Sequence, residues 1–580
     1  MKRKTMKKLA CALALTMTAT TMLAGCGSKT GEKADSSNTT AGSGTTEAKA
    51  AGTTGASQEK TGKISVMTYD RGTMANSEGT LNDNRWTTWI RENAPVKEIE
   101  FIAVAKAEAP QTMNNLFASG EGPDVVATYE DVLPFIQNGM AMEITDEMLD
   151  KMPNYKRILD KYPALRKLST VDGKLYTTGK LSNVLPNHAI VIRKDWLDNL
   201  GLEVPTTPEE LLAVAEAFTY DDPDGNGVDD TYAINMTSDA QRWLSHMWGF
   251  PNPEKYAMVD GELTYVWDRI ESWLDYSKQF VDKKLVNPDF MTMKGDDDKA
   301  DFLSGKIGIF ANGKFTQANT SIYSDFKKNN PDGYLDTFAM PETKYGKFCA
   351  YLNGGPSLLC FINSQTKDLD AALAYINWLY DPAVSEYLMF GPDGVYNKKD
   401  EEGTYTIVDA EKNAIEFNYS SDYSIIKNEL LEGGKEPVDR FANDYYNKYL
   451  KSDDPVMWEF GDLYYKMCEI ANDPEAVDPR KWQQGLPVLP SDLMVIKATA
   501  NKDVDNILLA ALGDSSKSAA EAVEEAKKAW YGAGGQKVED FYKAYYKEAG
   551  SNALLTEDFQ ELKAMPQMTE KAKKNSKLFQ

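Results

Sequence analysis

One loop in the sequence has the residue types and the spacing of a metal site. Between positions 222 and 230 the chain reads DPDGNGVDD, with oxygen-bearing side chains at alternate positions. Calcium binds about six to eight oxygen ligands, and a glycine at the sixth loop position gives the sharp turn; here that residue is Gly227. We expect a structural Ca2+ ion at this loop. Its predicted ligands are Asp222, Asp224, Asn226, the backbone carbonyl of Val228, and Asp230.

The loop differs from a calcium-binding EF-hand at one position. An EF-hand carries a bidentate glutamate at position twelve, where this chain has Ala233. Aspartate, proline, asparagine and glycine are also the ordinary residues of tight turns. A turn that binds no metal is therefore the alternative interpretation.

Aromatic residues are the second candidate feature. The chain contains 11 tryptophans and 30 tyrosines, and flat rings with N–H or O–H groups can stack on sugars and bind their hydroxyls. Most of these rings must belong to the core, and Trp273 is interpreted as a packing residue. Rings beside loops are better ligand candidates, although a core position is an equal alternative for each: Tyr69, Trp243, Trp248 and Tyr396.

The sequence contains no recognisable catalytic arrangement. His188 and His246 lack a neighbouring cysteine or second metal-binding residue, so each is interpreted as a hydrogen-bonding residue. There is no GxSxG, HExxH or P-loop motif. The 88 acidic residues make chance pairs unavoidable, so the carboxylate dyad of a glycoside hydrolase cannot be identified.

Residues 1–25 are predicted to be a lipoprotein signal peptide. Basic residues precede an apolar run over 9–24 that is too short for a membrane-spanning helix. The run ends in LAGC, which matches a lipobox, so Cys26 is predicted to carry the lipid. From there to residue 62 the chain has no bulky apolar residue, which predicts a flexible tether over 26–62.

Charge and cysteine content limit the possible partners. The formal net charge of −24 repels nucleic acid and anionic lipid headgroups, so no nucleic-acid partner is expected and membrane attachment is expected through the lipid alone. After Cys26 only three cysteines remain. Cys349 and Cys360 could form a disulfide bond, and buried free thiols are the alternative for these two and for Cys468.

Strand and helix patterns alternate along much of the chain. A helix is predicted from the capping box at Thr207, with proline at the first helical position, and another over 368–380. The alternation indicates an α/β core, and residues from about 410 to 580 are predicted to be mostly helical, including 519–531 and 538–547. Short apolar runs predict buried strands at 63–69, 124–128, 189–192, 306–310 and 357–362.

In its order of motifs the chain resembles the family 1 extracellular solute-binding proteins of ABC importers, in particular the large oligosaccharide-binding lipoproteins of Gram-positive bacteria. The resemblance covers roughly residues 63–400. Its most specific part begins at Ile192 and reads IRKDWLDNLGLEVPTTPEELLAVAEAFTYDDPDGNGVDDTY. Further agreement comes from GEGPDVV at 120–126, VDGKLY at 171–176, SGKIGIF at 304–310 and AALAYINWLYDP at 371–382.

The resemblance implies a two-lobed, periplasmic-binding-protein-like α/β fold of type II, with a hinge and a largely helical C-terminal region. Lobe 1 would consist of residues 63–185 and 353–393. Lobe 2 would consist of residues 186–352 and be completed by 394–580. The chain would cross between the lobes near 185–188, 353 and 394.

The resemblance also implies a ligand site between the lobes. Ligand contacts are carried over by position to loops of this sequence: Tyr69, Arg71, Tyr129, Glu130, His188, Trp243, Trp248, Asn312, Asn353 and Tyr396.

The implied function is capture of an oligosaccharide by hinge closure and its delivery to ABC permease subunits, without catalysis. The protein would be a monomer, anchored by its lipid to the cell membrane on the extracytoplasmic face. A binder of peptides or other non-sugar solutes on the same scaffold is the main alternative, and a secreted glycoside hydrolase is another. Ligand titration and a hydrolysis assay distinguish these functions.

Overall fold

The computed structural model describes residues 59–580 except for 180–184, 187, 189, 294–296, 313–319, 350–351, 354–357, 402–404, 424–448, 478–488, 556–557, 559–569 and 579–580. The predicted signal peptide, the lipidation site Cys26 and nearly all of the predicted tether lie outside these residues. Within the described ranges, no helix combines the length and the apolar character needed to cross a bilayer.

One hydrophobic core, here called the first lobe, surrounds a five-stranded sheet with the strand order β2-β1-β3-β14-β6. Strand β1 is parallel to β2 and β3, whereas β14 is antiparallel to β3 and β6. Ile64 and Val66 of β1 are completely buried, as the apolar run predicted. The strands are β1 (Thr61–Asp70), β2 (Val96–Ala105), β3 (Val125–Thr128), β6 (Thr177–Gly179) and β14 (Leu359–Ile362).

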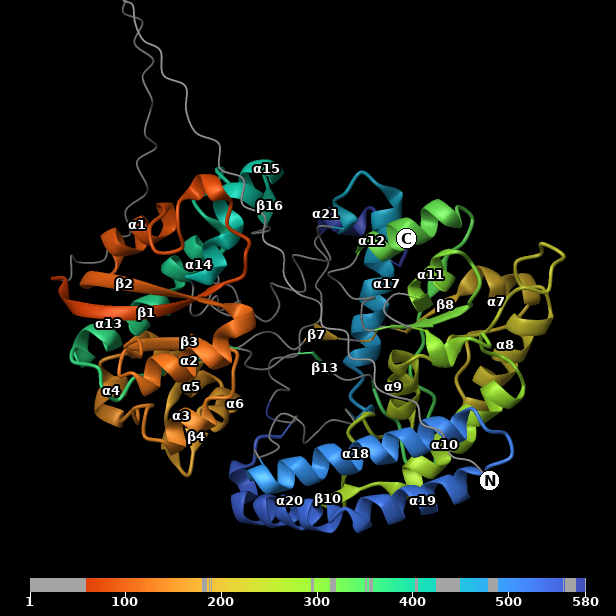
Figure 1. Cartoon of the computed structure of the whole chain (residues 1–580). Helices are drawn as coiled ribbons and strands as arrows, with labels where there is room; N and C mark the ends of the chain where they lie inside the picture. The colour runs from red at the N-terminus through yellow and green to blue at the C-terminus, as the bar shows by residue number, and fades with distance from the viewer. Residues whose placement is uncertain are drawn as a thin grey trace, which may run out of the picture. The chain divides into compact units, whose positions relative to one another are not determined.

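Helices pack on this sheet; α1 contacts β2 and α13 contacts β1 and β2 (Figure 1). Helix α1 begins after Asn84, whose side-chain oxygen accepts hydrogen bonds from the backbone N–H groups of Trp86 and Thr87 at 2.9 and 3.1 Å. The helices are α1 (Arg85–Asn93), α2 (Ala109–Ala118), α3 (Leu133–Gln137), α4 (Asp146–Asp150), α5 (Pro153–Lys161), α6 (Pro163–Leu168), α13 (Leu369–Leu379), α14 (Pro382–Phe390) and α15 (Ala410–Lys412). Short hairpins pair β4 (Thr170–Val171) with β5 (Lys174–Leu175) and β15 (Asn397–Lys399) with β16 (Tyr405–Ile407).

A second core, the second lobe, contains a three-stranded antiparallel sheet with β8 (Ile190–Arg193) between β11 (Ile309–Ala311) and β12 (Leu335–Asp336). A hairpin pairs β9 (Tyr256–Val259) with β10 (Glu262–Tyr265). The helices before residue 330 are α7 (Lys194–Leu200), α8 (Pro208–Tyr220), α9 (Ser238–Met247), α10 (Trp267–Asp282), α11 (Asp297–Leu303) and α12 (Thr320–Asn329).

The C-terminal region adds further helices to the second lobe. Helices α18 and α19 both pack on α10, and α20 packs on β10 (Figure 1). Trp530 of α19 is completely buried in the second core. These helices are α17 (Pro455–Ala471), α18 (Ser491–Leu512), α19 (Ala519–Gly532), α20 (Gly535–Ala549) and α21 (Glu570–Lys573).

Two predicted crossing segments pair with each other. Strand β7 (Leu185–Pro186) is antiparallel to β13 (Leu352–Asn353), at the positions where the chain was expected to pass between lobes. The first core extends farther along the chain than the expected boundary at residue 394. Tyr396 and Phe417 are buried in it because both rings pack against Trp86 of α1.

The predicted elements are confirmed with small changes in their ends. All five predicted strands overlap observed ones, and the predicted helix at 368–380 is α13. The capping box at Thr207 is present, because its hydroxyl accepts from the backbone N–H of Glu210 at 3.1 Å. The ten-residue strand β2 was not predicted from the sequence.

The three cysteines within the described residues are free and buried. The disulfide between Cys349 and Cys360 considered from the sequence is therefore not formed. Burial raises the pKa of the Cys360 thiol to about 12, so this thiol is not reactive at neutral pH.

Candidate functional site

A cavity of about 430 Å³ opens in the second lobe. It is surrounded by the start of α9, by α10, by residues 290–293 and 297–298, by the residue that follows β11, and by α18. The polar residues at its walls are Thr237, Ser238, Asp239, Gln241, Arg242, Asn252, Asp297, Asp298, Asn312 and Asp505, and the apolar ones are Met236, Pro253, Trp273, Phe290, Met291, Met293, Leu508 and Leu509.

Asn312, one of the predicted ligand residues, lies in this cavity because β11 ends one residue before it. Its side chain is 2% exposed, and its Nδ2 donates to Asp298 Oδ2 at 2.6 Å. Helix α11, which carries this aspartate, is fixed by Asp301, whose Oδ2 accepts from Asn235 and Asn287, both at 2.9 Å. The amide and the carboxylate are thus held in place by buried hydrogen bonds.

The start of α9 supplies an ion pair at the same cavity. Arg242 Nη1 lies 3.5 Å from Asp239 Oδ1, one helical turn away, and Arg242 Nε donates to the carbonyl of Asn252 at 3.3 Å. The guanidinium is therefore oriented from two sides. A fixed donor beside a carboxylate acceptor suits a ligand that offers both hydroxyl donors and acceptors.

Aromatic and aliphatic side chains complete the cavity. Trp273 is 2% and Phe290 7% exposed, so both belong to the core while they line the cavity. Trp273 was interpreted from the sequence as a packing residue only. A pocket with apolar surfaces and a few oriented polar groups has the composition of a small-ligand site.

Sequence reasoning missed most of these cavity residues. Asp239 and Arg242 lie just before the predicted segment 243–248, and Asp505 lies in a region for which only helices were predicted. The helical spacing of three between Asp239 and Arg242 was a usable signal. No signal in the sequence indicated that α18 lines the cavity, because its position there depends on tertiary packing.

The first lobe brings four other predicted residues together. Tyr69 is the last but one residue of β1 and Glu130 follows β3, and these parallel strands are neighbours in the sheet. The Tyr69 hydroxyl is 2.8 Å from Thr128 Oγ1, and it accepts from the backbone N–H of Tyr129 at 3.1 Å. Arg71 Nη2 donates to the Tyr129 hydroxyl at 2.9 Å. The ring of Tyr129 is 40% exposed at this edge, and the Tyr69 ring and the cations of Arg71 and Lys106 lie 5.5, 5.7 and 5.1 Å from its centroid.

His188 and Trp243 lie side by side, but inside the second lobe. Their ring centroids are 6.2 Å apart, and they are 2% and 1% exposed. Burial lowers the pKa of His188 to about 4, so the imidazole is neutral at physiological pH. Trp243 also packs on His246 at 5.4 Å. The structure therefore gives Trp243 a core position, the alternative that the sequence left open for it, and buries His188 beside it.

The remaining predicted ligand residues lie apart from the cavity. The Trp248 ring packs on Tyr276 and Tyr345 at 5.8 and 6.3 Å. Asn353 is in β13, and its side chain lies outside the described residues.

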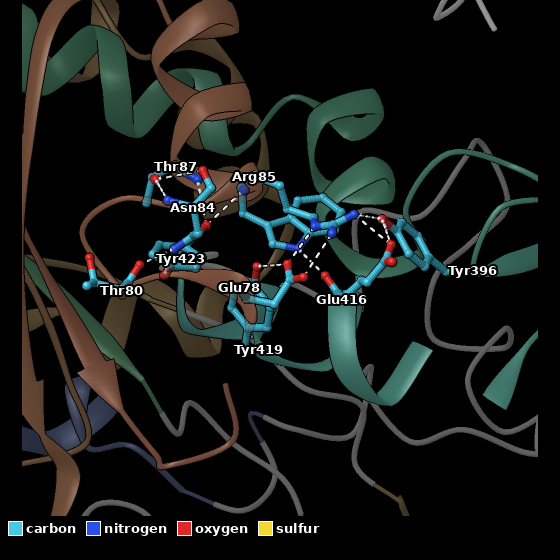
Figure 2. Close-up of polar contacts among 10 residues, drawn as sticks. Glu78, Thr80, Asn84, Arg85, Thr87, Tyr396, Glu416, Tyr419 and Tyr423 are labelled. Carbon is cyan, nitrogen blue, oxygen red and sulfur yellow. Dashed lines mark hydrogen bonds and ion pairs between the residues drawn. The ribbon is translucent and has the colours of Figure 1, made fainter. Parts of the chain in front are cut away.

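Tyr396 belongs to a network of charges in the first lobe. Figure 2 shows Arg85 between Glu78 and Glu416, at 2.6 Å from each carboxylate. Arg85 Nη1 also donates to the Tyr396 hydroxyl at 3.2 Å, and the Tyr419 hydroxyl donates to Glu78 at 2.7 Å. Burial raises the pKa of Glu78, but the hydrogen bonds from Arg85 and Tyr419 outweigh it and the pKa is lowered. The network joins Tyr396 and Glu416 to α1, and Tyr419 to Glu78 just before that helix.

The predicted calcium loop follows α8. The Asn226 side-chain amide donates to Asp224 Oδ2 at 2.8 Å and lies 3.5 Å from Asp230 Oδ1. Asp222 accepts from the backbone N–H groups of Asn226 and Gly227 at 3.1 and 3.0 Å. Three carboxylates thus share one loop, with an N–H donor between two of them.

The electrostatics of the loop fit a cation. The pKa of Asp224 is raised, first by burial and further by the neighbouring charges of Asp230 and Asp222. A positive ion would relieve this repulsion. Across the described residues, no group of three or more acidic, histidine or cysteine side chains is already arranged to hold a metal, so the three carboxylates would have to move closer to reach one ion.

The profile of the family described as bacterial extracellular solute-binding protein matches residues 92–386, about half of the chain. Over 321 residues the chain is 29% identical to the polygalacturonan/rhamnogalacturonan-binding protein YtcQ of Bacillus subtilis. This match covers 53% of the present chain and 63% of YtcQ. Over 305 residues it is 28% identical to the fructooligosaccharide ABC transporter substrate-binding protein FusA of Streptococcus pneumoniae, covering 48% and 54%. The chain thus matches less than two thirds of the length of these relatives.

Solved structures match over most of the chain. An extracellular solute-binding protein from Bifidobacterium longum subsp. infantis has a TM-score of 0.61 at 20% identity, covering 85% of this chain and 99% of that one. FusA in complex with kestose has a TM-score of 0.54 at 18% identity, covering 85% and 100%. The alginate-binding protein AlgQ2 without calcium ion has a TM-score of 0.56 at 15% identity, covering 85% and 99%. These similarities confirm the predicted two-lobed α/β fold.

Proposed function

The chain belongs to the family of bacterial extracellular solute-binding proteins, and we propose that it captures an oligosaccharide outside the cell and delivers it to the permease subunits of an ABC importer. The relatives support this class of ligand, since YtcQ and FusA are described as binders of carbohydrate polymers and oligosaccharides. They are binding proteins, and this chain is likewise proposed to act without catalysis.

The observation that carries the proposal is the composition of the 430 Å³ cavity. Buried Asn312 and Asp298 offer a paired amide and carboxylate. A sugar whose hydroxyl is missing or differently oriented at this pair would leave a buried polar group without a partner, which costs roughly 1–3 kcal/mol. Ring stacking on aromatic side chains such as Trp273 would add affinity with less selectivity.

Capture would involve both lobes. The exposed Tyr129 ring and the neighbouring Arg71 lie at the carboxyl ends of β1 and β3 in the first lobe, and they supply a second set of sugar contacts. Bending of the β7 and β13 segments would close the lobes on the ligand. The closed form would be the one that the permease recognises, because only ligand contacts with both lobes stabilise it.

The proposal includes the location of the protein. Lipidation of Cys26 would anchor it to the extracytoplasmic face of the cell membrane as a monomer, and the related Bacillus subtilis protein LipO is itself described as a lipoprotein. At roughly 0.8 kcal/mol per buried CH2, two or more acyl chains hold a protein firmly. The calcium ion at the loop 222–230 is also part of the proposal, and a solved FusA EF-hand mutant supports such a site in the family.

The test is thermal unfolding of residues 27–580 with a panel of oligosaccharides, peptides and free sugars. A ligand at 100 times its Kd stabilises the folded state by about 2.7 kcal/mol, so a shift in melting temperature with one oligosaccharide class is expected. A shift with peptides and none with any sugar would contradict the proposal. Hydrolysis of the stabilising sugar by the purified protein would instead favour the alternative function, a secreted glycoside hydrolase.

A further inference from the structure

We propose that helix α18 forms a selectivity wall of the ligand cavity, and that Asp505 and Leu509 on it favour an uncharged sugar unit over a uronic acid. This inference rests on the proposed function. Helix α18 lies outside residues 92–386, the segment matched by the family profile. Three of its residues nevertheless line the cavity: Asp505, Leu508 and Leu509.

Ion pairs and buried lysines hold α18 against the matched segment. Lys255, whose side chain is 1% exposed, pairs with Asp505 and donates to the carbonyl of Pro253 at 2.9 Å. Lys278 of α10 donates to the carbonyl of Ala511 at 2.8 Å, at the C-terminal end of α18, where a cation also complements the helix dipole. Figure 1 shows α18 alongside α10. Helix α18 is therefore held firmly against the segment that the family profile matches.

The wall presents one apolar and one acidic surface to the cavity. Leu508 is 3% exposed and belongs to the core, whereas Leu509 is 38% exposed at the cavity. Met291, across from the end of α18, is 46% exposed and also lines the cavity. Exposed large apolar side chains beside polar groups suit the apolar face of a sugar ring.

The charges of the cavity act against a carboxylated ligand. Its described lining residues include four aspartates, Asp239, Asp297, Asp298 and Asp505, and one arginine. That arginine, Arg242, is itself within 3.5 Å of Asp239. With Lys255 paired to Asp505, the four described carboxylates still outnumber the two cations, Arg242 and Lys255. A uronate would therefore meet a surplus of negative charge in a partly enclosed space, where like charges repel more strongly than in bulk water. Hydroxyls of an uncharged sugar can instead donate to these carboxylates.

The experiment measures binding by calorimetry to residues 27–580, using fructo-oligosaccharides, other neutral oligosaccharides and oligogalacturonates. We expect a neutral class to bind at least about tenfold more tightly than oligogalacturonates. The Leu509→Trp variant fills the cavity at α18 and should weaken binding about tenfold or more. Leu509→Lys should reduce the preference for the neutral sugar, because it adds a cation at the wall. Asp505→Asn is unsuitable, since it leaves buried Lys255 without its charge partner.

Val495→Trp and Val495→Lys are the matched controls. Val495 is on the same helix, is 67% exposed and does not line the cavity, so these variants should bind like the parent chain. Equal affinity of folded Leu509→Trp and the parent chain would overturn the role of α18, and tighter binding of oligogalacturonates would overturn the selection against charge. If the parent chain binds no sugar at all, the proposed function fails together with this inference.

Discussion

Calcium should stabilise the second lobe through the loop 222–230. The loop is tied to that lobe on both sides, because Asn199 Nδ2 donates to the carbonyl of Pro223 at 3.0 Å and the Thr231 hydroxyl donates to the carbonyl of Phe218 at 2.9 Å. An ion bound only to the folded loop at 100 times its Kd adds about 2.7 kcal/mol to the free energy of unfolding. At about 2.1 cal/mol/K of unfolding entropy per residue, that corresponds to a rise of about 4 °C in Tm for a lobe of roughly 300 residues.

The assay is thermal unfolding of residues 27–580 with EDTA and then with excess calcium. Asp224→Ala removes one predicted ligand and should abolish the calcium-dependent rise in Tm. Asp229→Ala removes the same charge from an exposed loop residue that is not a predicted ligand, so it should keep the rise. The reasoning is refuted if the two variants respond alike, or if the parent chain melts at the same temperature with EDTA and with calcium.

The pH dependence of the same transition gives an independent check. Without calcium, burial and the neighbouring carboxylates raise the pKa of Asp224 above its ordinary 3.8. The folded state then binds a proton more tightly than the unfolded state, so this residue's contribution to stability falls as pH rises past 3.8. Bound calcium favours the ionised carboxylate and should reverse the sign of this contribution. Parallel pH profiles with and without calcium would contradict the assignment.

Three further changes have defined expected outcomes. Cys26→Ala should release the protein from the cell membrane into the medium, as measured by immunoblotting of cell and medium fractions; retention in the membrane would contradict lipidation. Thr207→Ala removes the cap of α8 and should cost about 1 kcal/mol in urea unfolding, whereas the control Thr207→Ser keeps a capping hydroxyl and should cost much less. Burial lowers the pKa of His188 to about 4 in the folded state. On acidification this imidazole therefore binds a proton at a higher pH in the unfolded state than in the folded state. Stability should therefore fall by up to about 3 kcal/mol between pH 6.5 and 4, and His188→Gln should flatten this slope.

Local signals in the sequence were enough for the elements of the fold. Proline and a capping box mark the start of α8 at Thr207, and the apolar run after Lys63 marks β1, because caps and buried strands depend on residues close in sequence. The crossing segments β7 and β13 came from the family resemblance, since four residues of short strand carry no periodic signal of their own.

The site was predicted only in part, because distant segments build it. Asn312, which was carried over by position from the family resemblance, lines the cavity directly after β11. Trp243 was expected at the ligand and lies in the core, whereas Trp273 was expected in the core and also lines the cavity. The helical spacing of apolar residues places both rings on buried helix faces. It does not indicate where the packing of side chains leaves a cavity.

The end of the family match at residue 386 is not the end of the structural unit. Removal of α18 would leave the ammonium groups of Lys255 and Lys278 without Asp505 and the Ala511 carbonyl. An uncompensated buried charge costs several kcal/mol, a large part of the stability of a typical domain. The same deletion would open one side of the cavity. The lysines in the matched segment and the helix outside it therefore depend on each other, so α18 belongs to the fold of the second lobe as well as to the proposed ligand site.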